Sequence, residues 1–347
     1  MRQFFVPDLP DRFREKYRIE DSSSYDIATR RHNLTLNAKA IRRCLYRPFD
    51  ERWLYYDPGL TSRPAEKAMR HMIHGSNLAL IATRQTQEEF GVLTTEMLCG
   101  HKSCASYDIN NVFPLYLYPN GKVPDDDLFV REEPDEAKRR PNLSAAFIDD
   151  LCGRLEVKFV PEGLGKPSKR QVGPELIFNY AYAVFHSPSY RQRYAEFLRT
   201  DFPRLPLTSN YDLFRELAGF GGWLVDLHAR NQADGSAIGF PVNGNNVIEE
   251  ARYQPPETTG KDRHPGRVWI NGEQYFEGIA PETWAFPIGG YLPAQRWLKD
   301  RKGRTLSYED KETYPRIIAA LGETSRLMKD IDTAITKHGG WPGAFAL

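Results

Sequence analysis

The stretch from Asn210 to Arg230 constrains the fold most, because its apolar residues recur at the spacing of an α-helix. One face of that helix would carry Leu213, Leu217, Phe220, Leu224 and Leu227. An amphipathic helix must bury such a face against another layer of structure. The sequence therefore predicts a globular fold in which this helix is half-buried.

Strand-like patterns are concentrated in the first half of the chain. Apolar runs over residues 77–84, 90–97 and 112–118 predict strands, and Pro114 predicts an edge or a break in the third. Residues 38–56 predict a short basic helix, a turn at Pro48 and an aromatic strand, and residues 65–74 predict a further helix.

Helices dominate the second half. Pro174 suits the first turn of a helix, and Ser187-Pro188 suits an N-cap with a first-turn proline. After that restart, one apolar stripe would carry Tyr190, Tyr194 and Phe197. Strands are expected at 247–253 and 267–270, with a hairpin at Asn271-Gly272, and Tyr314-Pro315 is expected to open the last helix. The predicted class is α+β, with mixed strands and amphipathic helices and a helical second half.

The expected organisation has three parts. Residues 1–30 form a lead segment or linker, residues 31–335 form one domain or two lobes, and residues 336–347 form a tail. The lobes would be a strand-rich part over 31–170 and a helix-rich part over 171–335. The polar stretch 119–142 favours a solvated loop over a DNA-contacting one.

Composition narrows the setting of the chain. It has no apolar run long enough for a membrane span and no secretory h-region, and its four cysteines do not make a disulfide framework. These features predict a cytoplasmic protein without membrane contact. The net charge of +1 argues mildly against a stand-alone DNA-binding domain, so any such role must rest on local clusters of cations.

No catalytic pattern emerges. The chain has no phosphate-binding loop, no GxGxxG and no methyltransferase loop of the polar-Pro-Pro-aromatic type, so no catalytic residue, cofactor site or metal site is predicted. Cys99, His101 and Cys104 lack a fourth zinc ligand and more simply predict two thiols beside a surface histidine. The sequence shows no nucleophile or carboxylate in a recognisable pattern with His71 that would allow acid–base catalysis, which favours a structural role for this residue.

Cations gather between residues 296 and 304. The cluster contains Arg296, Lys299, Arg301, Lys302 and Arg304, together with Trp297 and Gly303. Such a segment suits a loop that grips a nucleic-acid backbone, and it equally suits a solvated helix end. We predict phosphate contacts by these five cations.

Two pairs of polar residues are candidates for base contact. Arg84-Gln85 directly follows a predicted strand, and Arg and Gln are the side chains that pair bidentately with guanine and adenine. Asn110-Asn111 is a weaker candidate, because turn chemistry explains an asparagine pair equally simply. The same holds for the loop from Asn243 to Asn246.

Several long strings in collinear order resemble one known family. In the first half they are YRPFDERWLYYD (46–57), SRPAEKAMRHM (62–72), NLALIATRQ (77–85) and FPLYLYP (113–119). In the second half they include FRELAGFGGWLVDLH (214–228), NGEQYFEGIAPETWAFPIGGY (271–291) and RWLKDRKGRTLSYED (296–310). These strings are similar to the C-terminal target-recognition, or specificity, region of type ISP restriction-modification enzymes, over about residues 41–335.

That resemblance implies a target-recognition-type domain that reads an asymmetric duplex DNA site beside an adenine-N6 methyltransferase. It also implies partners, namely DNA and the methyltransferase, helicase and nuclease domains. S-adenosylmethionine and ATP with Mg²⁺ would belong to those domains and not to this chain, which lacks their motifs. Arg47, Arg52 and Arg70 join the predicted phosphate contacts, although arginines flanked by aromatic residues also pack and pair.

Two other interpretations remain. The chain could be a structural subunit or remnant that docks a partner and has no DNA affinity of its own, which its near-neutral charge favours. It could also be an enzyme built on His71, Asp57 or the Cys99 cluster.

Overall fold

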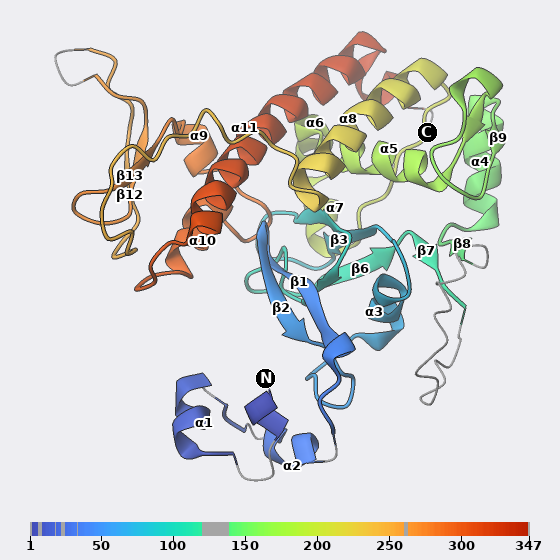
Figure 1. Cartoon of the computed structure of the whole chain (residues 1–347). Helices are drawn as coiled ribbons and strands as arrows, with labels where there is room; N and C mark the ends of the chain where they lie inside the picture. The colour runs from blue at the N-terminus through green and yellow to red at the C-terminus, as the bar shows by residue number, and fades with distance from the viewer. Residues whose placement is uncertain are drawn as a thin grey trace.

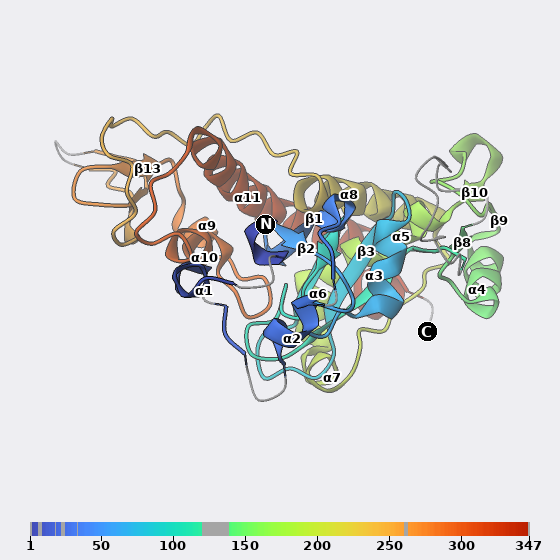
Figure 2. The same cartoon turned by 60° about the horizontal axis from the view of Figure 1, so that its bottom comes forward.

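The computed structural model describes residues 2–5, 9–17, 19–21, 25–32, 34–119, 139–259 and 263–345. Helices and several small sheets make up the fold, which confirms the α+β class. In both views, α5, α8 and α11 lie between the two ends of the molecule, and in Figure 1 they lie above the sheets (Figures 1 and 2). One end carries α4 with β9, and the other carries β12 and β13 with α9 and α10.

Two three-stranded sheets form the body of the first half. The first has the order β2-β1-β5 and the second the order β4-β3-β6. Their strands are β1 (Ile41–Arg47), β2 (Asp50–Tyr55), β3 (Ala79–Thr83), β4 (Val92–Thr95), β5 (Leu98–Cys99) and β6 (Asn110–Pro114). The helix α3 (Glu66–Ile73) lies between β2 and β3 in sequence, as the pattern over 65–74 predicted.

The short basic helix expected after residue 38 is wrong. Only a 3-10 turn forms, η2 (Ala38–Ala40), and the following residues form β1. These residues form a strand and not a helix because they pair antiparallel with β2, with Ile41 opposite Tyr55 and Arg43 opposite Trp53. Tertiary pairing with an aromatic strand thus outweighs the modest helix preference of arginine-rich sequence.

Two helices of the second half begin where the sequence predicted. Pro174 is the first-turn proline of α5 (Pro174–His186). Asn210 caps α8 (Tyr211–Ala229), and its side chain accepts a hydrogen bond from the Leu213 amide at 3.0 Å. The two helices approach so closely that a Cβ on Gly221 would lie 1.8 Å from the Asn179 carbonyl oxygen. Only glycine fits there, which explains a helix-disfavouring residue inside α8.

The last long helix differs from the prediction. α11 (Tyr308–Lys337) begins before Tyr314-Pro315, because Ser307 and Asp310 form a capping box at its N-terminus. Pro315 lies inside the helix, where it removes one backbone donor, and the helix continues through it. The strong cap and the long buried face of α11 outweigh that loss.

The restart at Ser187 is confirmed, since this residue caps α6 (Pro188–Arg193) with its side chain. The helix breaks at Tyr194, so Phe197 lies on the separate α7 (Ala195–Thr200). The hairpin at Asn271-Gly272 also forms, between β12 (Arg267–Trp269) and β13 (Tyr275–Glu277), and β11 (Arg252–Gln254) flanks it.

The remaining elements are short. They are η1 (Arg2–Phe5), α1 (Asp11–Tyr17), α2 (Ile27–His32), β7 (Tyr116–Leu117), β8 (Arg140–Pro141), α4 (Ala145–Leu155), β9 (Lys158–Phe159), η4 (Pro167–Lys169), β10 (Gln171–Val172), α9 (Pro281–Trp284), α10 (Pro293–Lys299) and α12 (Gly340–Gly343). The break between β6 and β7 falls beside Pro114, as predicted. Most of the predicted polar loop 119–142 lies outside the described residues.

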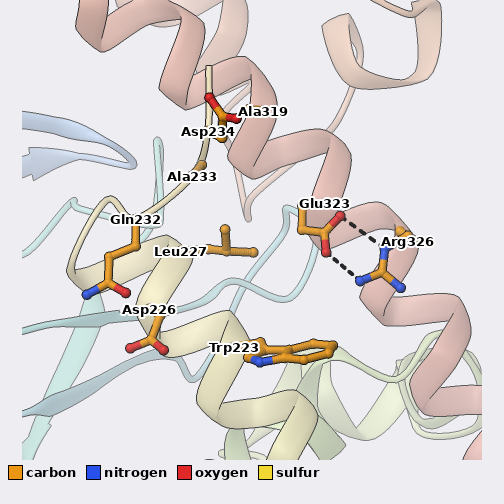
Figure 3. A pocket seen from close by; sticks show the side chains of 9 residues that line it. All are labelled: Trp223, Asp226, Leu227, Gln232, Ala233, Asp234, Ala319, Glu323 and Arg326. Carbon is orange, nitrogen blue, oxygen red and sulfur yellow. Dashed lines mark hydrogen bonds and ion pairs between the residues drawn. The ribbon is translucent and has the colours of Figure 1, made fainter. Parts of the chain in front are cut away.

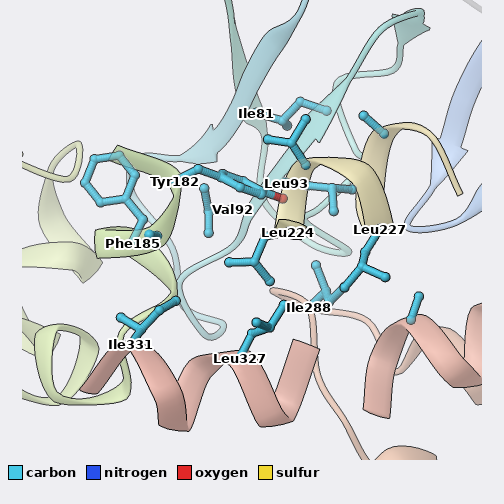
Figure 4. Packing of buried hydrophobic residues seen from close by; sticks show 14 of the residues in the cluster. Ile81, Val92, Leu93, Tyr182, Phe185, Leu224, Leu227, Ile288, Leu327 and Ile331 are labelled. Atoms are coloured by element: carbon cyan, nitrogen blue, oxygen red, sulfur yellow. The ribbon is translucent and has the colours of Figure 1, made fainter. Parts of the chain in front are cut away.

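One large core joins the two halves of the chain. Figure 4 shows Ile81 and Leu93 of the sheet facing Leu224 of α8 and Leu327 of α11. The same cluster reaches from Leu45 to Phe345, so the two expected lobes share their core, and the division at 170 stays a prediction. In the described residues, no helix is both long enough and apolar enough to cross a membrane.

Candidate nucleic-acid interface

Asp50 is the centre of a charge network that joins the first hairpin to the C-terminal third. Its side chain is 2% exposed. One carboxylate oxygen accepts from Arg52 at 2.6 Å, and the other accepts from Arg301 at 2.9 Å. Arg301 also lies over the Trp297 ring at 3.6 Å and donates to the Trp297 carbonyl. Both guanidinium groups therefore hold the hairpin against the segment after α10.

The network extends through Asp300 and Asp310. Arg296 pairs with Asp300 at 3.0 Å, Arg52 approaches Asp300 at 3.7 Å, and Arg301 approaches Asp310 at 3.5 Å. These three arginines and three aspartates balance in charge. Arg52, Arg296 and Arg301, predicted as phosphate contacts, thus belong to the internal network of the fold, since a buried carboxylate needs such partners.

The other cations of the segment are free. Lys299, Lys302 and Arg304 are exposed, and their side chains have no partner within the described part of the chain. Lys299 ends α10, and the other two lie in the turn that follows, where Gly303 has a φ of 78°. These three remain the predicted phosphate contacts of this segment.

Arg47 and Arg70 also serve the fold. Arg47 donates to the Lys102 carbonyl at 2.8 Å and lies over the rings of Tyr46 and Tyr291. Arg70 is half-buried, and its Nε lies 3.3 Å from the His71 ring. Arg47 therefore supports the loop that contains Lys102, and its assignment to phosphate contact stays a prediction.

Arg84 and Gln85 lie at the end of β3, as predicted. Arg84 is 54% exposed on its side chain, pairs with Asp201 at 3.3 Å and lies over Phe202. Gln85 is exposed and has no side-chain partner among the described residues. An oriented guanidinium beside a free amide is an arrangement that base edges can meet. Their assignment to base contact stays a prediction.

The asparagine pairs behave differently. Asn110 is 4% exposed, and its side chain accepts from the Cys104 amide and donates to the Gly100 carbonyl, both at 3.1 Å. These bonds stabilise the loop in the chain as described, and the assignment of Asn110 to base contact stays a prediction. Asn111 is half-buried on β6 and stays a weak candidate. Asn245 and Asn246 bond to Asn271 and Gln274, which is turn chemistry.

Two loops that the sequence did not connect form one unit, here named the double loop (residues 84–90 and 100–109). Glu88 accepts from the amides of Ser106 and Tyr107 at 2.9 and 3.2 Å. In return, Asp108 accepts from Thr86 Oγ1 and the Gln87 amide at 3.0 and 2.9 Å. The loops lie close to α7, because the Thr86 amide donates to the Arg199 carbonyl; they are the cyan-to-teal loops at the lower edge of Figure 2.

Cations also gather beside the double loop. Burial and the positive charges of Arg63, Lys102 and Arg47 lower the pKa of His101. Arg63 is exposed and has a φ of 54°, a conformation that costs an arginine free energy and often marks functional loops. Sequence reasoning missed Arg63 and Lys102 because neither belongs to a run of cations.

His71 and Cys99 belong to the hydrogen-bonded and packed interior of the first half. His71 is buried and its Nδ1 accepts from the Tyr118 amide at 3.0 Å. Burial raises the pKa of the Cys99 thiol to about 12, so that thiol stays protonated. Within the described ranges, no group of His, Cys, Asp or Glu is arranged to hold a metal ion.

Buried polar groups tie the three central helices together. Tyr182 of α5 donates to His228 Nδ1 at 2.6 Å, and His228 Nε2 on α8 donates to Thr324 Oγ1 on α11 at 2.8 Å. Thr324 in turn donates to the Ala320 carbonyl, which fixes the direction of the chain of bonds. Burial lowers the pKa of His228 to about 3, so its imidazole stays neutral.

A groove of about 600 Å³ lies between α8 and α11 (Figure 3). Trp223, 56% exposed, lies at its edge. Asp226, Asp234 and Glu323 line it, with Arg326 as the only lining cation among the described residues. A lining with this excess of carboxylates repels phosphate, so this face does not suit a nucleic acid.

The fold and the site define an α+β domain with a rigid loop pair and a few free cations. The model of the Type ISP C-terminal specificity domain family matches residues 11–330, so the chain belongs to that family. No curated protein matches the chain.

Three solved structures share the fold. A DrdV–DNA complex has a TM-score of 0.64 at 20% identity and covers 88% of this chain and 30% of its own. LlaBIII, an ATP-dependent Type ISP restriction-modification enzyme bound to DNA, has a TM-score of 0.65 at 16% identity. The match covers 95% of this chain and 21% of the LlaBIII chain. A nuclease-deletion mutant of the Type ISP enzyme LlaGI with a DNA substrate mimic has a TM-score of 0.58 at 18% identity. The match covers 88% of this chain and 26% of the LlaGI chain. The chain thus spans less than a third of each of these longer proteins.

Proposed function

We propose that the chain is the duplex-DNA target-recognition module of a type ISP restriction-modification system. The observation that carries this proposal is the family match over residues 11–330, joined by the fold shared with three proteins solved with DNA or a DNA mimic. In this role the chain reads an asymmetric site and positions a methyltransferase and nuclease on it. Such a division is physically reasonable, because base readout and catalysis need different surfaces.

The distribution of charge favours contacts with DNA at a few local sites and not across a broad basic face. The net charge of +1 gives little long-range attraction to DNA. Lys299, Lys302 and Arg304 supply phosphate contacts at one place, and Arg63 and Lys102 supply them beside the double loop. Arg84 and Gln85 supply base contacts from the end of β3.

The chemistry of the system belongs to partner domains. S-adenosylmethionine and ATP with Mg²⁺ would be bound by methyltransferase and helicase-nuclease domains, in the same or another polypeptide. This chain contributes register and affinity, and it works in the cytoplasm, where those partners meet DNA.

Fluorescence anisotropy with a labelled random duplex tests the proposal. We expect binding at about 50 mM salt that weakens by about a hundredfold or more at about 200 mM, since each phosphate contact releases counterions. The proposal would be overturned by an affinity for duplex that does not change with salt concentration, or by the absence of binding at low salt. Unlabelled duplex as competitor controls for dye binding.

A second candidate is a subunit that docks a protein partner and has no DNA affinity. The exposed Trp223 beside the acid-lined groove favours it, because exposed aromatic residues are typical anchors of protein interfaces. The same titration separates the two candidates, since this one predicts no binding of duplex at any salt.

A further inference from the structure

Tyr107 is an exposed aromatic residue on a backbone that is held on both sides. The residue is 71% exposed. Its amide donates to Glu88 at 3.2 Å, and its carbonyl accepts from Lys102 Nζ at 3.0 Å. Charged side chains thus fix the peptide groups on either side of the ring, while the ring itself has no partner among the described residues.

The loop that carries Tyr107 is also fixed to the body of the protein. The Tyr291 hydroxyl lies 3.0 and 3.1 Å from the carbonyl oxygens of Lys102 and Ala105. Ser103 Oγ donates to the Leu45 carbonyl at 2.8 Å. A Cβ on Gly289 would lie 1.9 Å from the Cys104 carbonyl oxygen, so the backbones touch there. The position of Tyr107 is therefore set by β1 and by the segment before α10.

The double loop places Tyr107 in one rigid unit with the predicted base contacts. Asp108, directly after Tyr107, holds Thr86 and Gln87, which directly follow Gln85. Arg84 and Gln85 cannot move far without breaking these bonds. Gln85 and the backbone of Tyr107 therefore belong to one hydrogen-bonded unit.

The Tyr107 ring is exposed on a backbone that is already fixed. Covering the ring removes apolar area from water, and the fixed backbone reduces the entropy lost when a ligand binds. A tyrosine ring loses little side-chain entropy on binding and can stack on a base or pack against a thymine methyl group. Lys102, whose Nζ donates to the Tyr107 carbonyl, adds a cation beside the ring and favours a ligand that carries phosphates.

We infer that Tyr107 contacts the bases of duplex DNA through its ring and is a specificity-determining residue of the double loop. The inference rests on the proposed function and adds to it a contact that Arg84 and Gln85 do not supply. Their polar side chains recognise base edges by hydrogen bonds, whereas the Tyr107 ring recognises the apolar thymine methyl group in the major groove.

Photo-crosslinking to duplexes that contain 5-iodo-deoxyuridine at random positions tests this contact. The duplexes are mixed with the full chain at low salt, irradiated and digested, and the crosslinked peptides are mapped by mass spectrometry. Anisotropy on the same samples first establishes binding. Tyr107→Ala removes the ring, Tyr107→Phe keeps it, and Trp223→Ala removes an exposed ring from the acid-lined groove as the matched control.

We expect a crosslink at Tyr107 that persists in Tyr107→Phe and is lost in Tyr107→Ala, with at least a fivefold weaker yield of total crosslinks in the last variant. Trp223→Ala should crosslink as the unmodified chain does. Binding without a crosslink at residue 107 overturns this inference and leaves the proposed function standing. Absence of binding by the unmodified chain overturns both.

Discussion

The carboxylate of Asp50 and the guanidinium of Arg301 form an ion pair at 2.9 Å between residues 251 positions apart in the chain. The pair joins the β1–β2 hairpin to the segment that follows α10. Arg52 completes the coordination of Asp50 at 2.6 Å. A carboxylate this deeply buried is stable only because both of its oxygens accept from charged donors.

Replacing Asp50 with alanine should therefore destabilise the fold. Arg52 and Arg301 would each lose the nearer of two carboxylate partners in a partly buried site, and we expect a loss of about 3 kcal/mol in the free energy of unfolding. Urea denaturation followed by tryptophan fluorescence measures it. Arg304→Ala, an exposed and unpaired cation of the same segment, is the control and should change stability by less than about 0.5 kcal/mol. Equal effects of the two changes would contradict the network.

Removing the free cations should weaken DNA binding without unfolding the protein. In the triple variant of Lys299, Lys302 and Arg304 to alanine, the slope of log affinity against log salt should become shallower by about 1 per cation. The slope comes from anisotropy titrations at several salt concentrations. Lys329→Ala, an exposed lysine on α11, should leave the slope unchanged. An unaltered slope in the triple variant would exclude this segment from the interface.

Gln85→Ala should reduce sequence preference more than it reduces affinity. A bidentate side chain contributes about 1–3 kcal/mol of discrimination at one base pair, whereas random-sequence affinity depends on phosphate contacts. Competition between a selected site and its single-base variants measures this preference. Gln232→Ala, an exposed glutamine at the acid-lined groove, is the matched control. If Gln85→Ala kept the full preference at every position, Gln85 would not read a base.

Acid should destabilise the protein through His228. Burial lowers the pKa of its imidazole to about 3, below the value of an unfolded histidine near 6.5. The unfolded chain therefore takes up the proton more readily, so stability is complete above about pH 6.5 and falls as the pH decreases towards 3. Between pH 7 and pH 5 the loss from this residue should be about 2 kcal/mol.

The pKa of the neighbouring His186 is lowered for the same reason, so it acts in the same direction. Urea denaturation at pH 7 and pH 5 measures the total. His228→Gln should unfold more easily at pH 7 but lose less stability on acidification than the unmodified chain. A stability that stays constant from pH 7 to pH 5 would contradict a buried neutral His228.

The sequence predicted those parts of the fold that local signals determine. Pro174, Ser187 and Asn210 mark helix starts by chemistry within one turn, and the structure has a helix at each. The helix expected after residue 38 failed because β1 depends on pairing with β2, which single-strand periodicity cannot show. The predicted start of α11 was wrong because a proline typically occupies the first turn of a helix, whereas Pro315 lies inside α11 and the capping box at Ser307 begins it.

The candidate site was less predictable, because its contacts join distant segments. A cluster of cations between 296 and 304 looks uniform in sequence, but only the position of Asp50 decides that Arg301 is bound and Lys302 is free. Likewise, the reciprocal bonds of Glu88 and Asp108 span 18 to 22 residues, and no local pattern connects Tyr107 with Gln85.

Selection of duplexes from a random DNA pool by the purified chain, followed by sequencing, tests the central claim most directly. We expect one asymmetric motif to be enriched at low salt. The enrichment should be stronger at higher salt, where contacts to phosphate alone no longer suffice to retain a duplex. Recovery of bound duplexes without any enriched motif at either salt would contradict the claim that this chain reads a DNA sequence.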